Sequence, residues 1–356
     1  MDTRFAFAFA FALALPAAAA VGCGSSTADT AATSSTSDTT STTATSGTAA
    51  GGAGPMTTST GASAPGAGGG ATTGSASGGG GGVNAGGAPP TFVVGGVRPA
   101  TVYTPPSYDG SPAPLFMMLH GYGATGDVEE FYLHLAPEVA ARGAFYVYPT
   151  GTVDPSGENF WNATDACCNF YGSTVDDDAY LTSMIDEIAS KVAIDPKRVF
   201  LMGHSNGGFM TYRMACNHAD KIAGIAVLAG DMVLDVSECN PSAPVSVLHI
   251  QGTADTTVAY NGGSVVAGWP PFPGATTSVG DWVTFDQCNT TADTSGPPMD
   301  IEASLPGAET TVSEWHGCAQ STDVQLWTIQ NGSHIPNFQQ SFAGTLMDWV
   351  VAHPKP

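Results

Sequence analysis

Short apolar runs alternate with longer amphipathic stretches along the chain from about residue 91 onward. Each run is rich in Val, Leu, Phe or Tyr and ends in polar residues or glycine, as a buried parallel strand followed by a loop does. The segment from Thr91 to Thr104 predicts one or two leading strands before them. The six main runs are PLFMMLHG, GAFYVYPTG, RVFLMGHS, IAGIAVLAG, PVSVLHIQG and VQLWTIQNG.

The stretches between the runs have helical character. One helix is predicted from Phe131 to Arg142, with Gly143 as its C-cap, and another from Asp177 to Val192, where acidic residues suit a helix N-terminus. Asn206 to Asn217 and Phe342 to Ala352 complete the predicted helices.

The repeated order of strand, helix and strand predicts an α/β fold. Its central sheet should be mostly parallel, with helices on both faces. Ligands of such sheets bind at the carboxyl ends of the strands. The polar tips of the six apolar runs are therefore where chemistry is expected.

The first 90 residues differ from the rest in composition. Residues 1–23 have the character of a signal peptide, because Arg4 precedes a long apolar stretch that ends in small residues. A transmembrane helix is the alternative interpretation. Ala20 to Cys23 resembles the lipobox of bacterial lipoproteins, which implies lipidation of Cys23, but simple cleavage and full secretion stay open. Residues 24–90 are mainly Ser, Thr, Ala and Gly and predict a disordered linker, so residues 91–356 form the folded domain.

The charge of the chain is strongly acidic. Among 356 residues, 31 Asp and Glu stand against 9 Lys and Arg, and the net charge is −22. Because phosphate binding needs clustered Lys and Arg and no basic run exists, nucleic acid is not an expected partner. The acidity is typical of a soluble extracellular protein, and a lipid anchor would be its only link to a membrane. We expect a monomer.

Six of the seven cysteines lie in the predicted folded domain. An even number in an exported domain favours disulfides over a metal site, and no CxxC pair or histidine cluster accompanies them. Cys288 and Cys318 are expected to pair, which would attach a long excursion to the core. Neighbouring Cys167 and Cys168 are expected to have separate partners, with Cys216 and Cys239 as candidates.

Ser205 lies in the stretch LMGHSNGGFM, whose centre matches the pattern GxSxG between a predicted strand and a predicted helix. In such a turn the glycines avoid collisions and the serine hydroxyl is exposed as a nucleophile. A serine nucleophile needs a base, and the base needs an acid to orient it. The pattern therefore predicts partners on loops after later strands.

Asp255 and His334 occupy the expected positions of the acid and the base. Asp255 follows the run PVSVLHIQG, and His334 follows VQLWTIQNG in a loop that contains glycine. His316 is the second candidate for the base. Asp231 and Asp281 are the alternatives for the acid.

An oxyanion hole requires two backbone N–H groups that point at the developing negative charge. One is expected from Asn206, directly after the nucleophile, where the helix dipole adds to the effect. The other is expected from Tyr122 in LHGYG, after the first long apolar run. An ordinary glycine turn is the alternative interpretation of LHGYG.

Two side chains are candidates for substrate contacts. Trp161 could stack on an aromatic acyl group or a sugar ring, or it could only pack its loop. His204, next to the nucleophile, is the second candidate. The acidic run Asp176 to Asp178 is interpreted as a helix cap with a buried hydrogen bond rather than a cation site. No metal site is expected.

The motifs LHGYG, WNATDACC, VDDDAYL, IDPKRVFLMGHSNGG, GTAD and GSH occur in this order along the chain. Together they resemble the family of polyhydroxybutyrate depolymerase-like enzymes and secreted feruloyl or acetylxylan esterases. The resemblance implies an α/β-hydrolase catalytic domain over residues 91–356, with Ser205 as nucleophile, Asp255 as acid and His334 as base. It also implies a secreted or cell-surface enzyme that hydrolyses esters, polymeric esters included, without a metal or an organic cofactor.

The interpretation of the function keeps several alternatives. Plant-wall esters are preferred as substrates over polyhydroxybutyrate, and a peptidase of the same fold or a carbohydrate-binding protein without activity are the rival classes. Residues 267–278 and 289–309 depart from the simplest members of the family. We expect these two segments to shape the substrate cleft.

Overall fold

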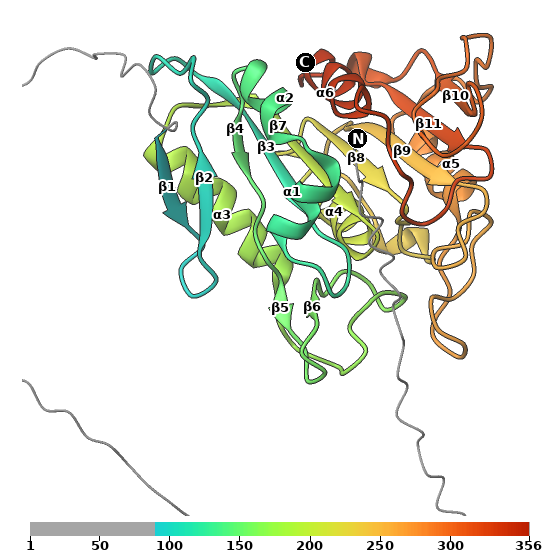
Figure 1. Cartoon of the computed structure of the whole chain (residues 1–356), viewed down its shortest axis with the longest axis horizontal. Helices are drawn as coiled ribbons and strands as arrows, with labels where there is room; N and C mark the ends of the chain where they lie inside the picture. The colour runs from blue at the N-terminus through green and yellow to red at the C-terminus, as the bar shows by residue number, and fades with distance from the viewer. Residues whose placement is uncertain (1–89, 356) are drawn as a thin grey trace, which may run out of the picture. The chain divides into compact units, whose positions relative to one another are not determined.

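The computed structural model describes residues 90–355, so the predicted signal peptide, Cys23 and most of the linker lie outside it. The described residues form a nine-stranded sheet in the order β1-β2-β4-β3-β7-β8-β9-β11-β10, and β5 and β6 make a separate two-stranded sheet (Figure 1). The strands are β1 Thr91–Val94, β2 Ala100–Tyr103, β3 Ala113–Leu119, β4 Phe145–Val147, β5 Thr152–Val153, β6 Asn159–Phe160, β7 Ile194–His204, β8 Gly224–Leu228, β9 Ser246–Gly252, β10 Thr310–Trp315 and β11 Val324–Ile329.

The centre of the large sheet is parallel. Strands β4, β3, β7, β8, β9 and β11 pair with one another in parallel register. These are the six predicted apolar runs, and β1 and β2 are the predicted leading strands, which pair antiparallel at one edge. The opposite edge strand, β10, was not predicted, because its sequence TTVSEW is largely polar and most of it is only half-buried.

Helices cover both faces of the sheet (Figure 1). Along β3, Leu115 and Met117 belong to the core cluster that contains α3, α4 and α5, whereas Phe116 and Met118 belong to the cluster that contains residues of α2 and α6. This alternation follows from the strand period of two. The fold is that of an α/β-hydrolase. The helices are α1 Gly126–Leu133, α2 Ala136–Ala141, α3 Asp177–Lys191, α4 Asn206–Asn217, α5 Ala275–Phe285 and α6 Phe342–Ala352, with short 3₁₀ turns at Val236–Glu238 and Ala319–Ser321.

The single helix predicted from Phe131 to Arg142 is wrong, because the chain forms two helices here. Helix α1 ends at His134, whose φ of 52° is left-handed, and α2 starts afresh with a proline in its first turn. Because proline has no N–H to donate to an intrahelical hydrogen bond and disfavours a helical conformation of the residue before it, a break at this point is favoured. The predictions for α3, α4 and α6 agree with the observed bounds to within one residue.

The two segments that depart from the simplest members of the resembled family lie in different parts of the fold. Residues 267–278 lead into α5 and carry Trp269, which packs edge-to-face on Phe170. Residues 289–309 lie along the outer side of β10, where Asp293 bridges Glu314 and Met299 bridges Thr310. Glu302 in this segment also accepts a hydrogen bond from the Asn337 N–H, just after the predicted base His334. No helix among residues 90–355 is long and apolar enough to cross a membrane.

Three disulfides join the six cysteines of the described region. Cys288 is bonded to Cys318, as expected. The expectation that Cys167 and Cys168 have separate partners is wrong: they are bonded to each other, and Cys216 is bonded to Cys239. The physical reason is the distance between the cysteines in the folded chain. Cys216 in the last turn of α4 lies 5.0 Å, Cα to Cα, from Cys239 after the first 3₁₀ turn, which is normal disulfide spacing.

Removal of the Cys288–Cys318 bridge should destabilise the domain. The bridge closes a chain separation of 30 residues. The loop-entropy model gives a cost of about 3.5 kcal/mol for a loop of that length. Urea unfolding of the double variant Cys288→Ala/Cys318→Ala, compared with the unreduced parent, measures the loss. An unchanged midpoint would contradict this bridge, and peptide mapping without reduction identifies the pairing directly.

Candidate active site

Ser205 lies at the sharp turn between β7 and α4. Its φ of 54° and ψ of −120° are left-handed for a residue with a side chain, and its N–H donates to the Leu228 carbonyl of the neighbouring strand β8 at 2.8 Å. A serine held in this conformation at a strand-to-helix turn is the arrangement that exposes a nucleophile.

The glycines beside Ser205 are required by close approach of the backbone. A Cβ at Gly203 would lie 2.0 Å from the Gly207 carbonyl oxygen, and a Cβ at Gly207 would lie 2.2 Å from the Leu119 carbonyl oxygen. Neither distance is compatible with a side chain. The crowding brings the end of β3 directly against the turn, so that a Cβ at Gly121 would be only 3.3 Å from that of Ser205.

The structure brings Ser205, His334 and Asp255 together in one hydrogen-bonded chain. His334 Nδ1 lies 2.8 Å from Asp255 Oδ2, and His334 Nε2 lies 3.0 Å from Ser205 Oγ. Because a carboxylate only accepts, Nδ1 carries the proton, and Nε2 is left to accept the serine hydroxyl. This is the geometry in which an imidazole can take the proton of a serine nucleophile.

Asp255 is held as a fixed carboxylate. Its Oδ1 accepts the N–H groups of Thr257 and Val258 at 2.8 and 2.9 Å, and Oδ2 also accepts Gln251 Nε2 at 3.1 Å. Its side chain is fully buried. These bonds fix the carboxylate and leave Oδ2 directed at His334.

The loops that carry the acid and the base are joined to each other. They follow adjacent parallel strands, β9 and β11, whose ends are in register at Gly252 and Ile329. The Ala254 N–H donates to the Gly332 carbonyl at 2.9 Å. A Cβ at Gly252 would lie 2.2 Å from that same carbonyl oxygen, so the glycine allows the two loops to approach.

The loop after β3 leaves one N–H group available near Ser205. Gly121 N–H donates to Glu129, Gly123 N–H to the Asn159 carbonyl and Ala124 N–H to the Gly121 carbonyl. Within residues 90–355, the N–H of Tyr122 has no acceptor in the protein, and neither has that of Asn206 at the start of α4. Both predicted oxyanion donors are therefore free to bind a ligand oxygen.

Asn206 fixes a second loop against the turn with its side chain. Its Oδ1 accepts the Trp161 N–H at 2.7 Å, and its Nδ2 donates to the Trp161 carbonyl at 2.9 Å. The Trp161 indole in turn donates to the His120 carbonyl at 3.0 Å. His120 is also fixed, because its Nε2 accepts the Gly151 N–H and its Nδ1 donates to the Gly121 carbonyl. The loop after β3, which carries the predicted oxyanion donor Tyr122 and is called the oxyanion loop below, is thus held against α4 through Trp161.

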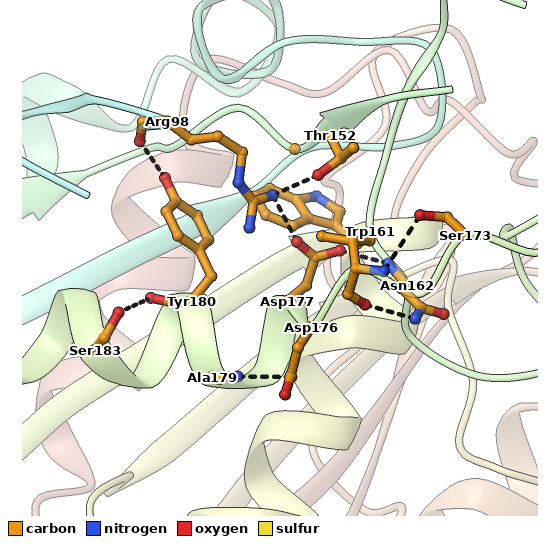
Figure 2. Close-up of polar contacts among 12 residues, drawn as sticks. Arg98, Thr152, Trp161, Asn162, Ser173, Asp176, Asp177, Ala179, Tyr180 and Ser183 are labelled. Atoms are coloured by element: carbon orange, nitrogen blue, oxygen red, sulfur yellow. Dashed lines mark hydrogen bonds and ion pairs between the residues drawn. The ribbon is translucent and has the colours of Figure 1, made fainter. Parts of the chain in front are cut away.

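The loop that contains Trp161 is also anchored through Asn162 by an ion pair between Asp177 and Arg98 (Figure 2). Asp177, at the start of α3 and fully buried, accepts Arg98 at 2.6 Å and the Asn162 N–H at 2.7 Å. Arg98 also donates to Thr152 and lies over the Tyr180 ring. Asp176 caps the helix by accepting the Ala179 N–H, as expected of the acidic run. No cluster suited to a metal ion occurs among residues 90–355.

The two predicted substrate contacts do not face an open surface. Trp161 is fully buried, and its indole N–H is used by His120. His204 is 6% exposed, and both of its ring nitrogens bond to protein atoms. As placed, both side chains are occupied by contacts within the protein. The burial of Trp161 agrees with the alternative interpretation, in which it packs its own loop.

The alternative acids and base lie outside the hydrogen-bonded chain. Asp231 is fully buried beside Ser278, and burial raises its pKa to about 8. Asp281 makes no bond to His334. His316 is half exposed beside Asp293 and Glu314 at the β10 edge.

Glu129 was missed by the sequence analysis. It is 3% exposed, and it bonds His204 at 3.0 Å and the Gly121 N–H at 3.1 Å. A signal was available: Gly126, Glu129 and Leu133 lie on the buried face of α1, and a carboxylate at helical spacing on an apolar face requires partners.

An open pocket lies next to the loop that follows Trp161. Its volume is about 730 Å³, and it is lined among others by Asn162, Asn169, Arg213, Glu238 and Trp269. No residue of the Ser205 chain lines it. A row of aromatic rings runs from Tyr122 to Phe170 and on to Trp269, each pair in edge-to-face contact at 5.1 Å. The row therefore connects the oxyanion loop with the pocket.

The fold and this site define the class of the protein, which is that of the α/β-hydrolases. The Phospholipase/Carboxylesterase family matches residues 107–267. The chain has the α/β-hydrolase fold and has homologues among feruloyl and acetylxylan esterases, which confirms that part of the resemblance seen in its motifs.

The relatives are similar at modest identity. Feruloyl esterase B of Piromyces equi is 31% identical over 244 residues, which is 67% of this chain and 42% of that protein. Feruloyl esterase D of Neurospora crassa is 25% identical over 69% of this chain and 77% of its own length. A bifunctional acetylxylan esterase/xylanase of Neocallimastix patriciarum is 29% identical over 47% of this chain and 22% of that protein. The chain thus spans less than half the length of two of these relatives.

Among solved structures, acetyl xylan esterase from Aspergillus awamori superimposes with a TM-score of 0.49 at 16% identity. The superposition covers 74% of this chain and 96% of that one.

Substitution Asn206→Asp should destabilise the protein. The new carboxylate would still accept the Trp161 N–H, but its second oxygen would face the Trp161 carbonyl, so that two acceptors meet in a buried site. We expect a loss of about 1–3 kcal/mol. Urea unfolding measures it, with the exposed Asn261→Asp as the matched control. Equal stability of the two variants would show that this clamp is unimportant.

Proposed function

We propose that this protein is a serine carboxylic-ester hydrolase. The observation that carries the proposal is the chain from Ser205 Oγ through His334 to the buried Asp255. Ser205 attacks the ester carbonyl while His334 takes its proton. The oxyanion is bound by the N–H groups of Tyr122 and Asn206, and His334 then returns the proton to the leaving alcohol. Water repeats the sequence on the acyl-enzyme and releases the acid.

The protonation state of His334 suits a general base. Burial lowers its pKa and outweighs the hydrogen bond to Asp255, while the charge of His204 lowers it further. The imidazole is therefore neutral at neutral pH, as a base must be before it accepts the serine proton. Asp255 stabilises the imidazolium that forms during the reaction.

The preferred substrates are plant-wall esters of the feruloyl or acetylxylan kind. The relatives named feruloyl esterase and acetylxylan esterase support this preference. The aromatic row from Tyr122 to Trp269 offers stacking surface, and the pocket beyond it offers amide and charged groups to a hydrophilic alcohol portion. Polyester hydrolysis is the alternative, since the motifs also resemble polyhydroxybutyrate depolymerases.

We place the enzyme outside the cytoplasm. Three disulfides in one domain are typical of an oxidising compartment. The predicted lipoprotein signal would tether the domain through Cys23, with the Ser- and Gly-rich segment as spacer.

Substitution Ser205→Ala should abolish hydrolysis and leave the fold intact. Turnover of p-nitrophenyl acetate should fall by about 10⁴-fold or more, because the nucleophile is lost. The exposed Ser295→Ala is the matched control and should keep the parent rate. If Ser205→Ala kept measurable turnover above the buffer rate while circular dichroism showed a native fold, the mechanism would be wrong.

A panel of substrates decides the specificity. Initial rates of the purified full chain on methyl ferulate and acetylated xylan should exceed those on polyhydroxybutyrate. A faster release of 3-hydroxybutyrate would make the protein a polyester depolymerase, and cleavage of a prolyl peptide without ester hydrolysis would make it a peptidase. Binding of xylan with no hydrolysis at all would indicate a carbohydrate-binding protein.

A further inference from the structure

A buried pair of charged residues connects the separate parts of the site. His204 comes from the end of β7, one residue before Ser205, and Glu129 comes from α1. Their side chains are 7% and 4% exposed, and His204 Nδ1 lies 3.0 Å from Glu129 Oε1. The mechanism proposed above gives no chemical step to either residue. Burial of a carboxylate and an imidazole costs free energy unless their polar atoms have hydrogen-bond partners. The partners of each atom therefore indicate what the pair does.

Both ring nitrogens of His204 face acceptors. Nδ1 meets the Glu129 carboxylate, and Nε2 lies 3.1 Å from the carbonyl oxygen of His334. A neutral imidazole has only one N–H, so both bonds together require the imidazolium. Burial lowers the pKa of His204, but the charge of Glu129 and the bond to it outweigh burial and raise the pKa above its ordinary value. The pKa of Glu129 is lowered by His204 against its own burial.

The second carboxylate oxygen of Glu129 reaches the oxyanion loop. Oε2 accepts the N–H of Gly121, the residue before the proposed donor Tyr122. One ion pair therefore touches the oxyanion loop through Gly121, the nucleophile turn through the backbone of His204, and the base loop through the carbonyl of His334. These segments follow β3, β7 and β11, which are not all neighbours in the sheet.

We propose that Glu129 and His204 are positioning residues that hold the oxyanion loop and the His334 loop at fixed distances from Ser205. The proposal rests on the esterase function proposed above. The pair touches no substrate; its bonds to Gly121 and to the His334 carbonyl set where the Tyr122 N–H and the His334 ring lie. Reaction rates depend steeply on such placement, and a displacement of about 1 Å can cost about 100-fold.

The positive charge of His204 has a second effect. Its ring centre lies 5.2 Å from that of His334. A neighbouring cation disfavours protonation of His334 and so lowers the pKa of the base. The other titratable groups that face His204 are Glu129 and Tyr132 from α1 and Asp255 from the loop after β9, while His120 at the end of β3 acts on Glu129.

The test uses Glu129→Gln, His204→Gln and the double variant in the full chain. Each single change should lower kcat for p-nitrophenyl acetate by about 10- to 100-fold with KM within about twofold, because chemistry and not binding is disturbed. The double variant should be about as slow as either single one, since the residues act as a unit. The matched control is His218→Gln, another histidine paired with a carboxylate, Asp178, in a bond remote from the site. It should keep the parent kcat.

The pH profile separates positioning from a merely structural role. The kcat/KM of the parent should rise with pH as His334 loses its proton. In His204→Gln the cation is gone, so the pKa of His334 should rise and the acid limb of the profile should move to higher pH. Parent kcat in both single variants, losses that multiply in the double variant, or an acid limb that stays in place or moves to lower pH would overturn the proposal.

Failure of the two proposals can be told apart. If the parent hydrolyses no ester, the proposed function fails, whereas an active parent with unaffected variants removes only the positioning role. If a glutamine variant does not fold, Glu129→Asp keeps the charge and shortens the reach by one carbon. It should show the same loss of kcat with an acid limb close to that of the parent, and undiminished kcat would count against the pair.

Discussion

The backbone at Ser205 turns through the left-handed region between a buried strand and a buried helix, and the carboxyl edge of the sheet is built around that turn. The turn is possible only because Gly203 and Gly207 let three stretches of backbone approach within contact distance. The end of β3 is pressed against Ser205, so the free N–H groups of Tyr122 and Asn206, the proposed oxyanion donors, are held in fixed positions.

Polar bonds fix the loops around the turn in addition to apolar packing. Asn206 clamps the Trp161 backbone, Trp161 holds His120, and Asp177 ties the following residue to Arg98 across the molecule (Figure 2). On the opposite side, Glu129 joins the oxyanion loop to His204. The groups in these networks are buried or half-buried and have their partners, which makes the positions specific as well as stable. The loops that carry the site thus behave as parts of the core.

Patterns that depend on neighbours in sequence could be predicted, and contacts between distant segments could not. The six parallel strands are continuous apolar runs, and the turn at Ser205 has its glycines at fixed spacing, so both were visible in the chain. The order of loops then pointed to Asp255 and His334. The break at His134 was missed because the apolar spacing continues through it. The disulfide partner of Cys216 and the burial of Trp161 depend on three-dimensional proximity that one sequence does not display.

Residues 289–309 cover the β10 edge of the sheet, where a second copy of the protein could otherwise pair with it. The outer edge of β10 would present unpaired N–H and carbonyl groups, which is how sheets of different chains join. Here Asp293 and Met299 each exchange two backbone bonds with β10, and the Cys288–Cys318 bridge fixes the start of the segment to the strand's far end. The covered edge leaves few groups for a second chain to pair with. This excursion therefore protects the acidic domain against edge-to-edge aggregation.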